Sequence, residues 1–184
     1  RLHPGWAGVS GITAAVLARG GVTGPRTTYE GRFGLYATHL SPDVAAADLA
    51  IATAELGSRW ETLRVAIKPF PVGSLNVAPT DAAIAIAKKH DFRPDDIASI
   101  EVLVPPHAVK TVCEPVAARK RPIDSYAAQF SIQYAIACGL LRQRFGLQEL
   151  ESYRDGDLLA LADKVSYRVD LNTSYPHRSA EVIV

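Results

Sequence analysis

A stretch rich in proline and small residues, 68–83, constrains the fold more than any other part of this 184-residue chain. A strand-like run, 63–67, leads into it, and an Ala-rich run that favours a helix leaves it and ends near Lys89. A junction of this composition can present backbone N–H groups and small hydroxyls at a helix N-terminus, where an anion is stabilised. Lys68 adds a positive charge there, although a plain structural connection with a solvated lysine also explains the pattern.

The composition excludes several classes of protein. Hydrophobic residues make up 48% and charged residues 21% of the chain, which is typical of a globular protein with a hydrophobic core. The formal net charge of +1 argues against nucleic-acid binding through bulk charge, and no apolar run reaches the roughly 18 residues of a membrane-spanning helix. Cys113 and Cys138 are too few for a disulfide scaffold and lack metal-ligand spacing. We therefore expect a cytoplasmic protein with no metal and no nucleic-acid or membrane partner.

The two ends of the chain indicate a piece of a longer protein. The sequence contains no methionine, so Arg1 is not an initiator residue, and no charged-then-apolar signal segment follows it. The last residues, 180–184, stop inside an expected strand. We expect the chain to be cut from a longer protein at both ends.

Hydrophobic periodicity and turn residues predict the order of helices and strands. Helices are expected over 6–18, 41–56, 80–89, 126–144 and 157–163. Strands are expected over 63–67, 97–104, 165–170 and 180–184. The stretch 23–40 is expected to be a loop that can contain a short helix, and 107–122 is ambiguous, since 109–112 could extend a strand. This order predicts an α+β fold in which a mostly antiparallel sheet has helices packed on one face.

Four short segments occur in an order that is typical of one protein family. They are R-L-H-P-G-W-A at 1–7, Gly24-Pro25 followed by E-G-R-F-G at 30–34, K-P-F-P at 68–71 with Asp81 downstream, and R-P at 121–122 followed by A-Q-F-S-I-Q-Y at 128–134. Together they resemble the MmgE/PrpD family, whose relatives include 2-methylcitrate dehydratase, cis-aconitate decarboxylase and iminodisuccinate epimerase.

The resemblance implies a large helical domain and a smaller α/β lid domain, with the active site in the cleft between them. Residues 1–57 would be the end of the helical domain, and residues 58–184 the lid domain, truncated at its C-terminus. Family members are usually homodimers and act on small di- or tricarboxylates without a metal or an organic cofactor. We therefore expect part of a cofactor-independent lyase or isomerase, with 2-methylcitrate dehydration ranked before epimerisation and decarboxylation. The isolated chain is expected to be inactive.

Abstraction of a proton next to a carboxylate needs a base, and it needs groups that hold the charges of the substrate. The candidates are Lys68 for carboxylate binding, Ser74 and Asn76 for hydrogen bonds to the substrate, and His3 for catalysis. His3 lies beside the position where the family often has a lysine. Each candidate also has a structural interpretation: a surface lysine, a turn or helix cap for Ser74 and Asn76, and a packed histidine.

The segment after Lys68 departs from the family pattern, since Val72 and Gly73 stand where the family commonly has two cysteines, and a histidine is missing. The family often has a histidine four residues before the aspartate of its K-P-x-P segment, and Val77 stands at that position here. Because valine cannot transfer a proton, another residue takes over, the chemistry differs, or the protein is inactive. A second hypothesis, of a different class, is therefore a non-catalytic binding or assembly module.

Overall fold

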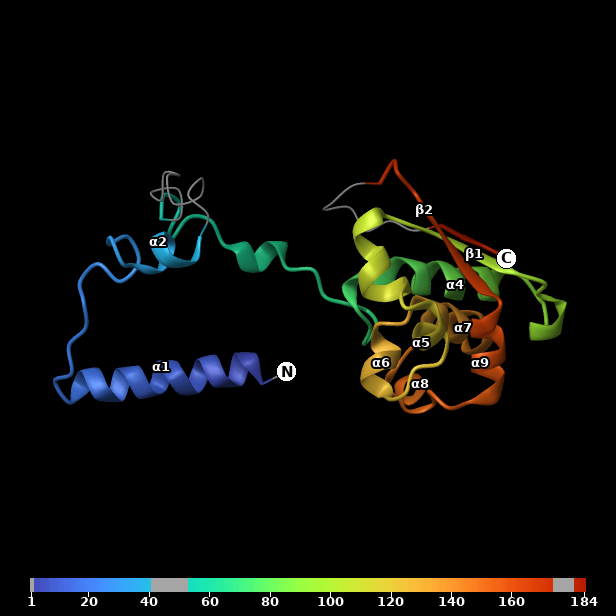
Figure 1. The fold of residues 1–184 in the computed structure, drawn as a ribbon, viewed down its shortest axis with the longest axis horizontal. Coiled ribbons are helices and arrows are strands. Elements are labelled where there is room, and N and C mark those ends of the chain that lie inside the picture. The colour runs from blue at the N-terminus through green and yellow to red at the C-terminus, as the bar shows by residue number, and fades with distance from the viewer. Residues whose placement is uncertain (1, 41–52, 174–180) are drawn as a thin grey trace. The chain divides into compact units, whose positions relative to one another are not determined.

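The computed structural model describes residues 2–40, 53–173 and 181–184 (Figure 1). It divides into two compact units, an N-terminal unit of residues 1–64 and a C-terminal unit of residues 65–184. Most of the helix expected over 41–56 lies outside the described residues. The assignment of 1–57 to a larger helical domain stays a prediction.

The described residues of the N-terminal unit form α1 (His3–Arg19), α2 (Leu35–His39) and the 3₁₀ helix η2 (Glu61–Arg64). The helix expected over 6–18 is confirmed, and it begins earlier because Pro4 suits the first helical turn. It ends before Gly20 and Gly21, and Gly21 has a φ of 92°, a conformation that glycine adopts without strain. The short helix expected within 23–40 is α2.

The strand expected over 63–67 is wrong. The chain forms η2 up to Arg64 and then continues without regular structure to residue 68. Leu63, Val65 and Ile67 are 85%, 67% and 89% exposed, although they alternate as in a half-buried strand. Alternation alone does not make a strand, because a strand also needs a neighbour to accept and donate its backbone hydrogen bonds.

The sheet of the C-terminal unit has the order β2-β1-β3, formed by β1 (Ile100–Val104), β2 (Val165–Val169) and β3 (Glu181–Ile183). β1 pairs with β2 in parallel and with β3 in antiparallel orientation, so the α+β class is confirmed but the sheet is mixed rather than mostly antiparallel. A long helix-rich connection, 105–164, separates β1 from β2, and a connection of this kind allows parallel pairing.

The helices of the C-terminal unit confirm most of the expected pattern. They are η3 (Ser74–Asn76), α4 (Val77–Lys89), η4 (Pro94–Asp96), η5 (Pro106–Ala108), the π-helical η6 (Val109–Cys113), α5 (Val116–Lys120), α6 (Ser125–Gln129), α7 (Ile132–Arg142), α8 (Leu147–Glu151) and α9 (Gly156–Asp163). The stretch 107–122 is therefore mostly helical. The helix expected over 126–144 is divided into α6 and α7, because the Ser131 side chain accepts a hydrogen bond from the Tyr134 N–H at 2.9 Å and begins a new helix.

α4 and α7 pack side by side and cover one face of the sheet (Figure 1). Ile100, Val102 and Val104 of β1 point into this core and are at most 1% exposed. The two helices approach closely at Gly139, where an added Cβ would lie 2.7 Å from the Ala83 Cβ. A second cluster, on the side of α7 toward α6, α8 and α9, contains Val72, Ala128, Tyr134, Ala135, Cys138, Phe145, Leu150 and Leu158.

Candidate functional site

The stretch that leads into α4 forms an open hollow of about 380 Å³, which we call the Lys68 hollow. Its lining residues are Ala66, Ile67, Lys68, Pro69, Ser74, Val77, Ala78 and Asp81. The structure thus brings together Lys68 and Ser74, two of the residues that the sequence nominates. The volume lies in the range of small-molecule sites.

The loop that carries Ser74 is held by one backbone carbonyl, that of Gln129 at the end of α6. The Gly73 N–H donates to this carbonyl at 2.8 Å, and the Asn76 amide Nδ2 donates to it at 3.1 Å. Gly73 permits the close approach, because an added Cβ would lie 3.2 Å from the ring of Phe130. Two segments that each carry a motif of the resemblance therefore meet at one carbonyl oxygen. No sequence pattern indicates this contact, since the acceptor belongs to the backbone.

Asn76 points into the protein rather than into the hollow. Its side chain is fully buried, its Oδ1 has no hydrogen-bond partner among the described residues, and its carbonyl accepts from the Thr80 hydroxyl at 2.6 Å. These contacts fix the turn at the start of α4. A direct contact between Asn76 and a substrate stays a prediction.

Lys68 and the start of the helix are the two features of the hollow that favour an anion, whereas Asp81 is a carboxylate in the same lining. The Lys68 Nζ donates to the Val72 carbonyl at 3.3 Å, a long hydrogen bond that a carboxylate could replace with a shorter, charge-assisted one. Ser74 is the first residue of η3, which continues directly into α4. The first backbone N–H groups of such a helix have no partner within it, and the helix dipole favours a negative charge there.

A comparison with protein families gives a match to the MmgE/PrpD C-terminal domain over residues 70–184, which is more than half of the chain. The chain belongs to the MmgE/PrpD family. Members of this family are lyase- or dehydratase-type enzymes. A comparison with curated proteins finds no match. The matched part of the MmgE/PrpD domain includes Ser74, Asn76 and Val77, whereas Lys68 lies two residues before it.

The residue at the position of the family's histidine lines the hollow. Val77 is half-buried and packs against the second hydrophobic cluster. Asp81, one turn further along α4, is exposed. His3, the remaining sequence-nominated residue, is exposed at the start of α1 and belongs to the N-terminal unit, whereas the Lys68 hollow belongs to the C-terminal unit.

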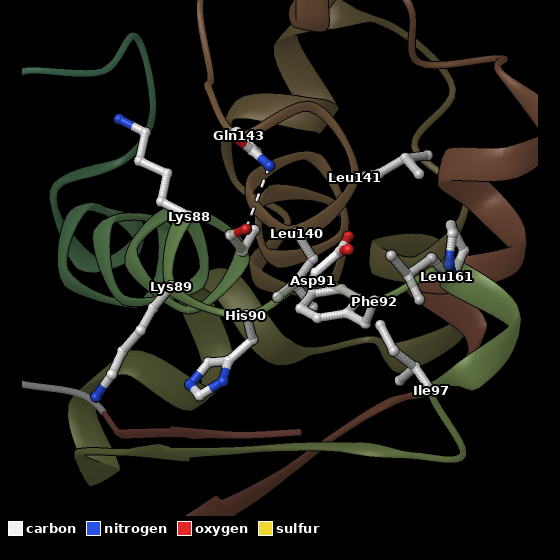
Figure 2. A pocket seen from close by; sticks show the side chains of 12 residues that line it. Lys88, Lys89, His90, Asp91, Phe92, Ile97, Leu140, Leu141, Gln143 and Leu161 are labelled. Carbon is white, nitrogen blue, oxygen red and sulfur yellow. Dashed lines mark hydrogen bonds between the residues drawn. The ribbon is translucent and has the colours of Figure 1, made fainter.

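A larger hollow of about 420 Å³ lies at the other end of α4, and we call it the Asp91 hollow (Figure 2). Its lining is mixed, and we call the part formed by the apolar residues Phe92, Leu140 and Leu161 its floor. Figure 2 shows the Lys88 and Lys89 side chains pointing away from this floor. The C-terminal ends of α4 and α7 carry partial negative charge, so this hollow suits a carboxylate less well than the Lys68 hollow does.

Among the described residues, neither the two cysteines nor a cluster of metal-binding side chains adds further chemistry. Burial raises the pKa of both Cys113 and Cys138 to about 12, so both thiols stay protonated at neutral pH and are poor nucleophiles. Within the described ranges, no group of three or more His, Cys, Asp or Glu side chains could hold a metal ion. In the same ranges, no helix is both long enough and apolar enough to cross a membrane.

Proposed function

We propose that this chain is part of a cofactor-independent lyase or isomerase that acts on small di- or tricarboxylates, with 2-methylcitrate dehydration as the first-ranked reaction. The match of residues 70–184 to the MmgE/PrpD C-terminal domain carries this proposal. Epimerisation and decarboxylation within the same family are the next reactions to test. In this proposal residues 58–184 belong to the lid domain.

The contacts of the Lys68 hollow support a role in holding the substrate. The Lys68 ammonium would bind one substrate carboxylate, and the Ser74 hydroxyl would donate a hydrogen bond to it. The same pair would stabilise the negative charge that develops on this carboxylate when the neighbouring carbon loses its proton. Asn76 would keep Ser74 in position through the Gln129 carbonyl. His3 would orient the substrate or transfer a proton.

One observation favours the second candidate, a non-catalytic binding or assembly module. Val77 provides no proton-transfer group at the position where the family often has a histidine. In a binding module the Lys68 hollow would still hold a carboxylate, but no carbon–hydrogen bond would break.

Proton exchange with solvent separates the two candidates. The full-length protein that contains this chain is mixed in deuterium oxide with 2-methylcitrate, citrate, cis-aconitate or iminodisuccinate, and proton NMR follows the carbons next to the carboxylates. If the protein is an enzyme, we expect one such proton signal to decrease at a rate proportional to the protein concentration. Unchanged spectra with all four compounds and a folded protein would favour the binding module.

The proposal also includes a homodimer, as the resemblance implies, and a cytoplasmic location, as the cysteine content suggests. Light scattering after size-exclusion chromatography of the full-length protein would test the assembly. A mass equal to one chain at micromolar concentration would contradict it.

A further inference from the structure

The lining of the Lys68 hollow is apolar except at three residues. Lys68, Ser74 and Asp81 carry the polar groups, and the apolar lining comes from Ala66, Ile67, Pro69, Val77 and Ala78. The one ammonium and the one carboxylate of the lining cancel in formal charge. Lys68 is the single cation of this lining, so the lining offers an ammonium partner to one ligand carboxylate.

A second ligand carboxylate would be unfavourable in the same hollow. Asp81 is four residues after Val77 on α4, so the two side chains lie on the same face of the helix. A ligand carboxylate near Val77 would be repelled by Asp81, and it would lose water without gaining a hydrogen bond from valine. The group of the ligand that contacts Val77 should therefore be uncharged and apolar.

Val77 is well suited to form a fixed apolar wall. Its side chain is half-buried and packs against the cluster that contains Val72 and Tyr134. A β-branched side chain also has little rotamer freedom in a helix. The turn before it is held by the hydrogen bonds from Gly73 and Asn76 to the Gln129 carbonyl, so the wall and Ser74 keep a constant spacing.

We propose that the Lys68 hollow selects a ligand in which the carboxylate bound by Lys68 stands close to a small alkyl group, and that Val77 determines this selectivity. The inference rests on the proposed function for its choice of substrates. It goes beyond that function because it assigns a specificity role to Val77, which stands where the family often has a histidine. The other carboxylates of a polycarboxylate would be bound outside this hollow.

The test compares two substrates that differ by one methyl group, 2-methylcitrate and citrate, with the full-length protein. One apolar carbon in an apolar site changes kcat/KM by about tenfold or more, so we expect a preference of about tenfold for 2-methylcitrate. Val77→Thr keeps the side-chain volume but replaces a methyl group with a hydroxyl, and it should reduce this preference to about one. Val77→Ala should reduce it in the same direction.

Val116→Ala is the matched control, because Val116 is a partly exposed valine on α5 that does not line the hollow. This variant should keep the preference of the unmodified protein. The inference is overturned if the unmodified protein prefers citrate, or if both Val77 variants fold and retain the preference for 2-methylcitrate.

A binding measurement separates failure of this inference from failure of the proposed function. If the protein converts neither substrate, 2-methylsuccinate and succinate are titrated while NMR follows the Val77 methyl signals. A preference of about tenfold for 2-methylsuccinate would support the inference without the enzymatic reaction. Equal binding of the two compounds, or no shift of the Val77 signals with either, would overturn it.

Discussion

The two ends of α4 are built from similar parts but differ in chemistry. At the start, the Asn76 amide donates to the Gln129 carbonyl at 3.1 Å, and Lys68 lies beside the hollow. At the end, the Gln143 amide donates to the Ala87 carbonyl at 3.2 Å, and Lys88 lies beside a hollow of similar size. Each end thus has an amide bound to a carbonyl, a lysine and a hollow.

The two ends of α4 differ in the sign of the partial charge that the helix dipole gives them. At the start, the helix dipole and Lys68 both favour an anion, so their effects add. At the end, Lys88 and Lys89 compensate the negative pole of α4, which stabilises the helix without creating an anion site. A lysine beside a hollow therefore indicates a carboxylate site only when the local backbone has the same preference.

Gly139→Ala should have the largest effect, because it disturbs the middle of α4 and so both of its ends. The added methyl group would lie 2.7 Å from the Ala83 Cβ, and the buried backbones of α4 and α7 would have to separate. We expect a loss of about 3 kcal/mol in the free energy of unfolding, measured by urea denaturation. Gly156→Ala is the control, since an added Cβ has no neighbour within 4 Å there. A Gly139→Ala loss as small as that of the control would mean that the two helices separate without cost.

Lys68→Gln and Lys88→Gln test the two ends directly. Removal of the Lys68 charge should raise KM for the carboxylate substrate of the full-length protein by about 10- to 100-fold, because a hydrogen bond to a charged group contributes about 1.5–3 kcal/mol. Lys88→Gln should leave KM unchanged, since its ammonium points away from the Asp91 hollow floor (Figure 2). Equal increases in both variants would show that the direction of α4 does not decide where the anion binds.

Asn76→Ala and Gln143→Ala compare the two amides. Asn76 is fully buried, whereas Gln143 is exposed and can exchange its hydrogen bond for one with water. We expect a loss of about 1.5 kcal/mol for Asn76→Ala and about 0.5 kcal/mol for Gln143→Ala in the free energy of unfolding. Only Asn76→Ala should also raise KM, because it alone releases the loop that carries Ser74. The reverse order of stabilities would mean that the end of α4 is held more firmly than its start.

Protonation of Glu149 at low pH should lower the free energy of unfolding, because Glu149 holds part of the second hydrophobic cluster, which contains Val72 and Tyr134. Burial acts to raise the pKa of Glu149, but the Gly146 N–H and the Arg144 guanidinium outweigh it and hold the pKa below its ordinary value. The Glu149 carbonyl also accepts from the Tyr134 hydroxyl at 2.6 Å, within the cluster that contains Val72. A lowered pKa means that the stabilisation is present above the unfolded-state pKa and is lost as the pH falls through the folded-state pKa.

We therefore expect Glu149→Gln to lower the free energy of unfolding at pH 7 by about 1 kcal/mol, a modest value because Arg144 is largely exposed. The difference from the unmodified protein should shrink as the pH falls below the ordinary range of glutamate. Glu151→Gln, an exposed change on the same helix, is the control for the removal of one carboxylate. Urea denaturation between pH 3 and pH 7 measures both, and a constant difference for Glu149→Gln would contradict the lowered pKa.

Local patterns were sufficient for much of the fold. The alternation of Ile100, Val102 and Val104 predicted a strand with one buried face, and the structure confirms it. The helix that ends at Lys89 was also predicted, although its first turn begins at Val77 rather than near Thr80. Lys68 and Ser74 were nominated from the same stretch and line one hollow. Such patterns report which face of a segment is buried and where a helix can begin, because both depend on neighbouring residues in the chain.

Contacts between distant residues decided the rest. The parallel direction of β2, the division of the 126–144 helix at Ser131, and the exposure of the alternating run 63–67 were all missed. The inward direction of Asn76 depends on a carbonyl 53 residues away. The sequence by itself therefore determined most of the elements, the family resemblance and the chemical groups near α4. Only the tertiary structure decided which strands pair and which of these groups face the hollow, because a hydrogen-bond partner distant along the chain leaves no periodic signal in the sequence.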